Sequence, residues 1–115
     1  MNKRIQALGR LPVGTMNKTE AEYAGYLEKL RIAGEVLWWK FEAVKFRLAD
    51  NTFYTPDFVV MAANQQIELH ETKGFWTEDA RVKTKVATDQ YPIFKFIAAK
   101  KLPKKAGGGW DIEEF

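Results

Sequence analysis

The sequence predicts an α/β fold in which two helices flank a mixed β-sheet, with the element order α-β-β-β-α-β. Residues 20–33 and 77–90 carry apolar side chains at the spacing of an amphipathic helix. The runs between and after these helices are rich in β-branched and aromatic residues and are bounded by turn residues, which is typical of strands. A chain of 115 residues is long enough for one hydrophobic core but not for two. That single core must also carry any active site.

The first helix is predicted over about residues 20–33. Thr19 followed three residues later by Glu22 is a capping-box pattern, and Gly34 ends the helix. At about 100° per residue, Glu20 lies about 60° from the centre of the apolar stripe, and Glu22 lies about 100° away on the other side. Glu20 is therefore the more inward carboxylate. The stripe consists of Tyr23, Ala24, Leu27 and Leu30.

Three strand regions follow. Residues 36–41 and 44–48 are predicted to form one long strand, or two strands joined by a bulge, before a turn at Asp50-Asn51. A second strand is predicted at about 54–61, and residues 62–65 turn the chain into a third at 66–73. The second and third strands should form a hairpin.

A second helix is predicted at 77–90, where Thr77 is the N-cap residue and two acidic residues follow at the positive end of the helix. Val82 and Val86 are expected to face inward. Residues 93–99 form a short apolar strand, which should pair parallel to an earlier strand because it follows a helix.

The C-terminal residues 104–115 are predicted to form a glycine-containing hinge and a final segment. Alternation of Trp110, Ile112 and Glu114 indicates an edge strand. The acidic and aromatic character of the same segment leaves open a tail that docks on a partner protein. At the other end, residues 1–18 are expected to be a basic arm.

Composition restricts the classes of function. The chain is 46% hydrophobic and 29% charged, which is typical of a globular protein. With no cysteine there is no disulfide, no thiolate zinc site and no cysteine nucleophile. The lone histidine, His70, disfavours histidine-rich metal sites and Ser-His-Asp hydrolases. A net charge of +3 and a pI near 9.1 suit a polyanionic partner.

The hydropathy pattern argues against a membrane protein. The longest apolar runs, such as 36–39 and 59–63, are far shorter than the roughly 20 residues that cross a bilayer. Residues 1–11 mix basic and polar residues and lack the apolar stretch of a secretory signal. We therefore expect a cytoplasmic protein.

Charged residues interrupt the apolar face of the predicted hairpin. Period-two alternation places Glu71 and Lys73 on the face that begins with Ile67 and Leu69, and Asp57 lies on the neighbouring strand. Such a break in the local pattern is where a functional site is expected. Two carboxylates and an ammonium group should meet at one end of the hairpin.

This group of side chains is suited to phosphodiester hydrolysis. The reaction needs a hard cation, and carboxylate oxygens such as those of Asp57 and Glu71 suit Mg²⁺ or Mn²⁺. The backbone carbonyl of Thr72 is a candidate third oxygen ligand, and Lys73 is placed to orient water or stabilise the phosphate. If Glu20 of the first helix reaches the same site, it would allow a second cation. Glu22 is the alternative candidate for this role.

Pro56-Asp57 and the later Glu71-Thr72-Lys73 resemble the PD-(D/E)xK nuclease motif, and the element order and upstream helix glutamate match that superfamily too. The wider runs 54–58, 70–74 and 79–85 resemble small phage-encoded endonucleases of the Holliday-junction-resolvase-like kind. The resemblance extends over about residues 19–97.

The resemblance implies a restriction-endonuclease-like core over residues 19–103 and a Mg²⁺-dependent DNA endonuclease, with Mn²⁺ able to substitute. It also implies a homodimer, because resolvase-like relatives must cut two strands, and a location in the host cytoplasm if the protein is phage-encoded. Branched or Holliday-junction DNA is the favoured substrate. A nicking or single-strand endonuclease and a non-catalytic DNA-binding module with a vestigial site stay open. The implied catalytic residues are Glu20, Asp57, Glu71 and Lys73, and the implied metal ligands are Asp57, Glu71, Thr72 and Glu20.

Four further residues are candidates for DNA contact. Lys83 lies on the flank of the second helix nearest the valines, whereas Arg81 and Lys85 point outward as an i, i+4 pair. Trp76 follows the motif and either stacks on a base or covers the core. His70 should face away from Glu71 and is interpreted as a hydrogen-bonded structural residue.

Overall fold

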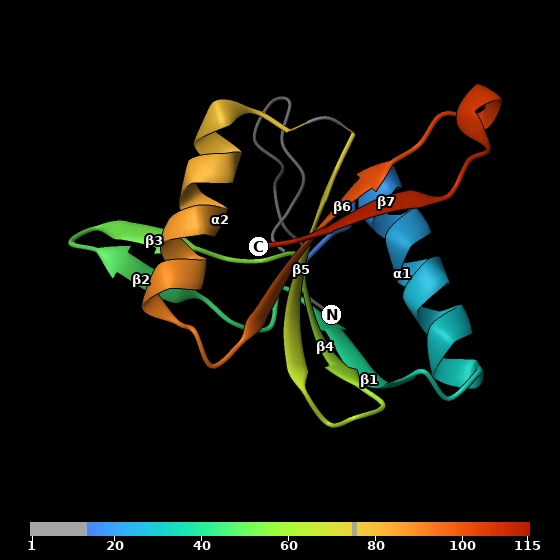
Figure 1. Cartoon of the computed structure of the whole chain (residues 1–115), viewed down its shortest axis with the longest axis horizontal. Coiled ribbons are helices and arrows are strands. Elements are labelled where there is room, and N and C mark those ends of the chain that lie inside the picture. The colour runs from blue at the N-terminus through green and yellow to red at the C-terminus, as the bar shows by residue number, and fades with distance from the viewer. Residues whose placement is uncertain (1–13, 75) are drawn as a thin grey trace.

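The computed structural model describes residues 14–74 and 76–115, and Figure 1 shows the arrangement of their helices and strands. The helices are α1 (Lys18–Ile32) and α2 (Glu78–Gln90), with a short 3-10 turn, η1 (Lys104–Ala106), near the C-terminus. The strands in chain order are β1 (Val36–Phe41), β2 (Phe46–Ala49), β3 (Thr52–Tyr54), β4 (Phe58–Ala62), β5 (Ile67–Lys73), β6 (Lys95–Lys101) and β7 (Trp110–Glu114). The predicted basic arm falls largely on residues 1–13, outside the described residues.

The main sheet is five-stranded and mixed, with the order β1-β4-β5-β6-β7. β5 and β6 are parallel, and the other neighbouring pairs are antiparallel. The predicted α/β class, the hairpin of the second and third predicted strands and the parallel pairing of β6 are therefore confirmed. β7 forms one edge of the sheet and β1 the other.

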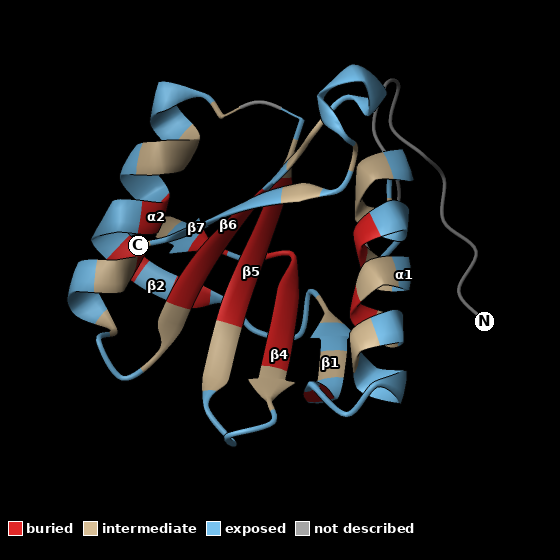
Figure 2. Ribbon diagram, turned by 45° about the vertical axis from the view of Figure 1, so that its right-hand side comes forward, coloured by how far each residue is buried: buried red, intermediate tan, exposed pale blue. Residues whose placement is uncertain are grey.

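The two helices pack on opposite faces of this sheet, as the ribbon in Figure 1 shows. Val59, Leu69 and Ala87 belong to the core on the α2 side, whereas Leu27 and Phe58 belong to the core on the α1 side. Burial is concentrated in β4, β5 and β6, which have a helix over each face (Figure 2). Strands covered on both faces carry mainly apolar side chains. A charged residue on them is therefore unusual and needs an explanation.

In the region between β1 and β4, the two strand segments and the turn at Asp50-Asn51 are confirmed, but their place in one sheet was predicted wrongly. Residues 36–48 do not form one strand in one sheet: β2 leaves the main sheet and pairs with β3 in a separate hairpin, closed by a turn in which Asn51 has φ 54°. The predicted strand 54–61 is also divided, so that Tyr54 ends β3 and Asp57 precedes β4. Pro56 explains the division, because proline lacks the N–H that a continuous ladder requires.

The start of α1 differs from the predicted capping box at Thr19. The N-cap is Asn17, whose side chain accepts a hydrogen bond from the Glu20 backbone N–H at 2.8 Å. The Glu20 carboxylate accepts one in return from the Asn17 N–H at 2.9 Å. Asparagine is as good an N-cap as threonine, so the box formed two residues earlier. Glu22 instead forms an ion pair with Lys101 on β6.

The inward face of α2 also differs from the prediction. Val82 and Val86 are 51% and 36% exposed, whereas Thr84 and Ala87 are buried. The Thr84 hydroxyl donates to the Ala80 carbonyl at 2.9 Å, which satisfies it without water. Small side chains on this face let the helix approach the sheet closely. Neither helix in the described residues is long and apolar enough to cross a membrane.

Candidate active site

Asp57 and Glu71 are joined through the backbone at the carboxyl end of β5. The Asp57 Oδ2 accepts hydrogen bonds from the Thr72 backbone N–H at 2.8 Å and from the Thr72 hydroxyl at 2.9 Å. The Asp57 backbone N–H in turn donates to Glu71 Oε1 at 3.2 Å. The segment before β4 and the end of β5 therefore hold both carboxylates in fixed positions. Both residues are buried.

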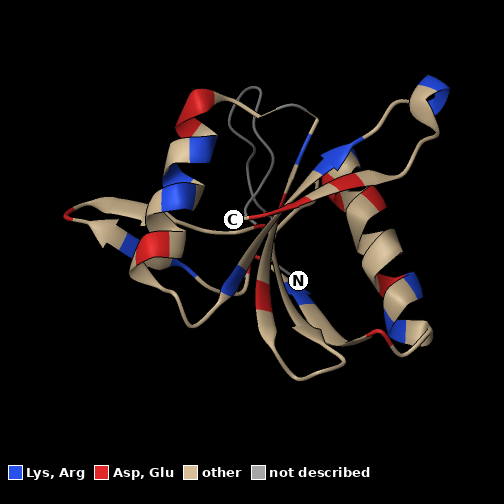
Figure 3. Ribbon diagram, viewed as in Figure 1, with Lys and Arg blue, Asp and Glu red and all other residues tan. Residues whose placement is uncertain are grey.

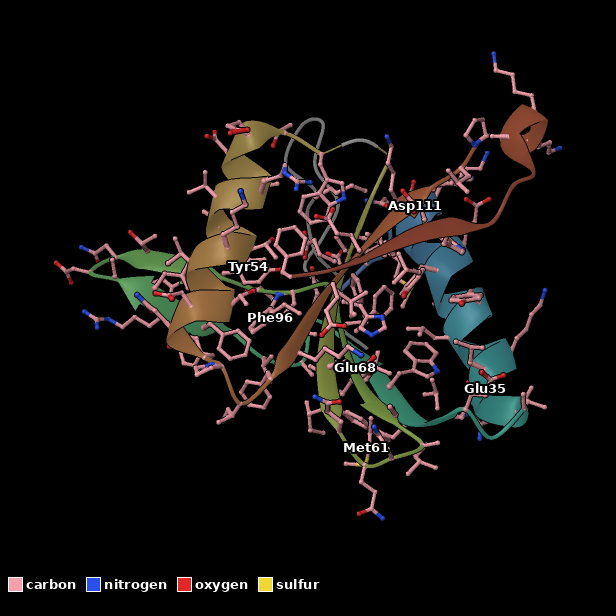
Figure 4. The ribbon with its side chains drawn as sticks, in the orientation of Figure 1. Glu35, Tyr54, Met61, Glu68, Phe96 and Asp111 are labelled. Atoms are coloured by element: carbon pink, nitrogen blue, oxygen red, sulfur yellow. The ribbon has the colours of Figure 1, made fainter. Side chains whose placement is uncertain are left out.

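Glu71 lies between a tyrosine and a lysine. The Tyr54 hydroxyl donates to Glu71 Oε1 at 3.2 Å, and Lys73 Nζ lies 3.4 Å from Glu71 Oε2. Tyr54 sits in the core beneath α2 (Figure 4). The Lys73 side chain is 38% exposed, so it connects the buried carboxylate with the surface. These groups line a cavity of about 250 Å³, which Lys83 of α2 also lines.

Burial disfavours the charged form of both carboxyl groups and raises their pKa values. Burial raises the pKa of Asp57 to about 6, and the charge of Glu71 adds to the effect, while the hydrogen bonds from Thr72 oppose it. Burial also raises the pKa of Glu71, and Lys73 opposes that shift. Two buried carboxylates of the same sign gain from a positive charge placed between them. In the structure the positive charge next to this pair is that of Lys73, whose Nζ lies 3.4 Å from Glu71 Oε2.

Glu20 lies at the edge of this pair. Burial raises its pKa, and the nearby carboxylates of Asp57 and Glu42 raise it further, while the hydrogen bond from the Asn17 backbone lowers it. However, no three histidine or acidic side chains in residues 14–74 and 76–115 form a group placed to hold a metal ion. Glu20 therefore lies close to Asp57, but the described residues do not form a preformed metal site that includes it.

The Thr72 carbonyl faces the same side of β5 as the Thr72 N–H. Within a strand, the N–H and C=O of one residue point to the same neighbour. Since the N–H bonds to Asp57, the carbonyl also faces the Asp57 side of β5. Its role as a metal ligand stays a prediction.

A family model described as "Protein of unknown function (DUF1064)" matches residues 14–107. The chain belongs to the DUF1064 family. Neither the curated proteins nor the solved structures contain a match to it. The matched range includes Glu20, Asp57, Glu71 and Lys73 and ends before β7. Because the family description assigns no activity, the functional argument rests on the chemistry of the site.

In this DUF1064 protein His70 is indeed on the opposite face of β5 from Glu71. Its Nε2 lies 2.8 Å from Glu68 Oε1, and its Nδ1 lies 2.6 Å from the hydroxyl of Tyr23 on α1. With the ring N–H directed at the Glu68 carboxylate, Nδ1 accepts from the tyrosine. The chain Tyr23–His70–Glu68 ties α1 to the sheet, and it lies on the face away from the cavity.

The proposed DNA-contacting residues occupy different surroundings. Lys83 Nζ lies 3.5 Å from the Phe53 carbonyl at the rim of the cavity. Arg81 is held by Glu113 of β7 at 3.1 Å, and Lys85 is exposed. Trp76 packs beside Phe115, with ring centroids 6.0 Å apart, so it is half-covered by the C-terminus. Phe75 lies outside the described residues.

Two neighbours of the site were missed by the sequence analysis. Tyr54 was assigned to the same strand as Asp57, and only the separate hairpin turns its hydroxyl toward Glu71. Lys100 is paired in register with Lys73 across the parallel strands β5 and β6. The sequence contained a signal for Lys100. A strand at 93–99 that is parallel to the strand at 66–73 places Lys100, the next residue, beside Lys73 at the end of the Glu71-Thr72-Lys73 motif.

Proposed function

We propose that this DUF1064 protein is a Mg²⁺-dependent DNA endonuclease of the PD-(D/E)xK kind with a restriction-endonuclease-like core. The observation that carries the proposal is the buried pair Asp57 and Glu71, linked through a backbone hydrogen bond of 3.2 Å, with Lys73 Nζ 3.4 Å from Glu71. A structural strand end would place apolar residues at such buried positions. Of the pair, Glu71 lines the cavity together with the partly exposed Lys73. Buried carboxylates with a perturbed pKa beside such a cavity are typical of an active site.

The donor set fits a hard cation. Asp57 Oδ2 is occupied by Thr72, which leaves Oδ1 for a metal, and Glu71 presents its Oε2 beside Lys73. Together with the Thr72 carbonyl these are oxygen ligands, which Mg²⁺ and Mn²⁺ prefer. Mg²⁺ is commonly bound by one or two carboxylates and several waters, so a third acidic ligand is not required. When bound there, the ion would lower the pKa of a water and neutralise charge on the phosphate.

Other residues of the chain would activate water, position Glu71 and bind DNA. Lys73 places a positive charge at the cavity, where it would orient the attacking water or stabilise the developing phosphate charge. Tyr54 and the Asp57 N–H hold Glu71 in position through its Oε1. Lys83, at the rim, would contact a phosphate, and Arg81, Lys85 and Trp76 would provide further contacts to DNA.

Branched or Holliday-junction DNA is the proposed substrate, cleaved by a homodimer so that two strands are cut. A nicking or single-strand endonuclease is the alternative among enzymes. A non-catalytic DNA-binding module is the second candidate function, because no group of three acidic or histidine ligands is present among the described residues. In that case the buried carboxylates would be remnants of a catalytic site.

A cleavage assay decides between these functions. We expect the wild-type protein to cut DNA in Mg²⁺ or Mn²⁺ and to be inactive with a chelator. Linear duplex, single-stranded, flap and four-way-junction DNA are compared in parallel, and the preferred substrate identifies the class of endonuclease. If none of the four is cut with either ion while DNA is still bound, the enzyme proposal is wrong and the binding module replaces it.

The two carboxylates of α1 should differ in their effect on the metal site. Glu20→Gln is expected to weaken Mn²⁺ binding by about tenfold or more, because Glu20 lies beside Asp57 and the loss of a group next to a metal ligand commonly costs this much. Glutamine also serves in a capping box, so α1 should still begin at the same residue. Glu22→Gln is the matched control on the same helix, where Glu22 pairs with Lys101. Isothermal titration with Mn²⁺ measures both, and equal losses, or none in either, would contradict the role of Glu20.

A further inference from the structure

The turn between β6 and β7, residues 102–109, projects from the edge of the sheet that carries the active site (Figure 1). We call this turn the lysine finger, because η1 at its tip carries Lys104 and Lys105, both exposed. β5 and β6 are parallel, so their carboxyl ends lie at the same edge, and Lys73 is aligned with Lys100. The finger therefore begins two residues after the direct neighbour of Lys73.

The backbone of the finger is ordered by its own hydrogen bonds. The Leu102 N–H donates to the Gly109 carbonyl at 3.0 Å, which closes the base of the turn. At the tip, the N–H groups of Ala106 and Gly108 both donate to the Pro103 carbonyl at 3.0 Å. Gly107, at φ 99°, ends η1 in a conformation that favours glycine. The two lysines are thus presented on a defined turn.

The charge of this region is only partly compensated. Among the described residues, Lys101 is paired with Glu22, whereas Lys100, Lys104 and Lys105 form no salt bridge. Asp111 of β7 lies opposite Lys100 in the register. Figure 3 shows basic residues at the ends of β5 and β6 and again at the tip of the finger. Cations without a carboxylate partner, such as Lys104 and Lys105, attract a polyanion.

On the α2 side of the site, the basic residue Arg81 is already engaged by other side chains. Arg81 of α2 is held by Glu113 and also lies over the Phe115 ring, with its guanidinium carbon 5.4 Å from the centroid. To bind a phosphate, Arg81 would first have to leave these partners. Lys104 and Lys105 have no such partners in the described part of the chain, so a phosphate there displaces only water and counterions.

We propose that the lysine finger binds the phosphate backbone of the DNA arm that flanks the cleaved bond. This inference rests on the proposed function. Lys104 is four positions after Lys100, so the tip lies at most about 14 Å from Lys100 even if the chain is fully extended. With a rise of about 3.4 Å per nucleotide, this reach covers roughly four nucleotides. The finger thus extends the DNA-binding surface from Lys73 to the η1 side of the site, beyond the contacts proposed for α2.

The test measures DNA binding at several salt concentrations, with fluorescently labelled duplex and four-way-junction DNA in the presence of a chelator. The double variant Lys104→Ala, Lys105→Ala is expected to bind more weakly and to lower the slope of log K against log salt by up to about 2, since each lost phosphate contact removes about 0.9. Lys104→Arg, Lys105→Arg should keep the wild-type slope. Lys29→Glu, in the last turn of α1, changes the net charge by the same amount and should leave the slope unchanged.

Each outcome decides the proposal. A double alanine variant with the wild-type slope, or an equal fall in Lys29→Glu, overturns the finger contact. Cleavage by the wild type together with an unchanged slope in the alanine variant removes the finger proposal alone. DNA binding with the expected slopes but without cleavage removes the endonuclease and keeps the finger. Absence of any DNA binding by the wild type overturns both.

Discussion

Replacing Lys73 by methionine is expected to reduce DNA cleavage by about 10²–10³-fold, the usual cost of removing one group that stabilises charge in the transition state. Methionine keeps much of the apolar stem of the side chain and removes the charge that lies 3.4 Å from Glu71. Because Lys73 is 38% exposed, its loss should change the stability of the fold by no more than about 1 kcal/mol. Initial rates on the preferred DNA substrate and a thermal melt measure the two effects separately.

The pH dependence of any residual activity provides a second measurement for the same variant. Lys73 lowers the pKa of Glu71, so its removal raises that pKa further. If ionised Glu71 is required, the acidic limb of the pH–rate profile moves to higher pH in Lys73→Met. Lys29→Met, at an exposed lysine in the last turn of α1, is the control and should keep both the rate and the profile. A Lys73→Met enzyme that cuts DNA at the wild-type rate would exclude Lys73 from the chemistry.

The core of the fold could be predicted because its signals are local. The period of apolar residues identified both helices, and the β-branched runs identified the strands that became β4, β5 and β6. Its position after the second helix then identified β6 as a parallel strand. These elements carry Glu71 and Lys73, which is why two members of the site were correctly placed next to each other.

The errors arose where tertiary packing or a single residue overrode the local pattern. Pro56 divided an apparently continuous strand, and the preceding segment paired outside the main sheet as β2 and β3. On α2, buried Thr84 satisfied its hydroxyl within the helix, so hydrophobicity alone gave the wrong face. The link between Tyr54 and Glu71 has no sequence signal of its own, because it depends on how separate elements pack. For Glu20, the helical angle predicted an inward direction, but only the packing of α1 on the sheet places it beside Asp57.

Replacing Asp57 by asparagine is expected to stabilise the metal-free protein while abolishing its response to metal. The pKa of Asp57 is about 6 in the folded protein against an ordinary value of 3.8. The folded state therefore binds this proton more tightly than the unfolded chain does. The metal-free wild type should be most stable below the unfolded value, near pH 4, and should lose stability as the pH rises through 6. The loss at neutral pH is at most about 3 kcal/mol.

Asparagine has nearly the same shape and retains an oxygen that accepts the hydrogen bond from the Thr72 N–H, but it carries no charge. The unfolding free energy of metal-free Asp57→Asn should therefore be higher than that of the wild type at pH 7. It should also fall less steeply between pH 4 and pH 6 than that of the wild type, with the remaining slope due to Glu71 and Glu20, whose pKa values are also raised. Urea titrations at several pH values measure this difference. Asp50→Asn, at a carboxylate whose side chain is 91% exposed, is the control and should keep the wild-type slope.

Addition of Mg²⁺ or Mn²⁺ should reverse the order of stability. In the wild type, binding of the ion offsets the repulsion between buried Asp57 and Glu71 and raises the unfolding free energy with metal concentration. In Asp57→Asn that increase, and cleavage with it, should be lost. A variant that is less stable than the wild type without metal would show that Asp57 acts as a structural acceptor for Thr72. If Asp57→Asn is more stable than the wild type without metal and no longer responds to metal, the Asp57 carboxylate destabilises the fold but binds the cation. That pair of results would support a role for Asp57 as a metal ligand.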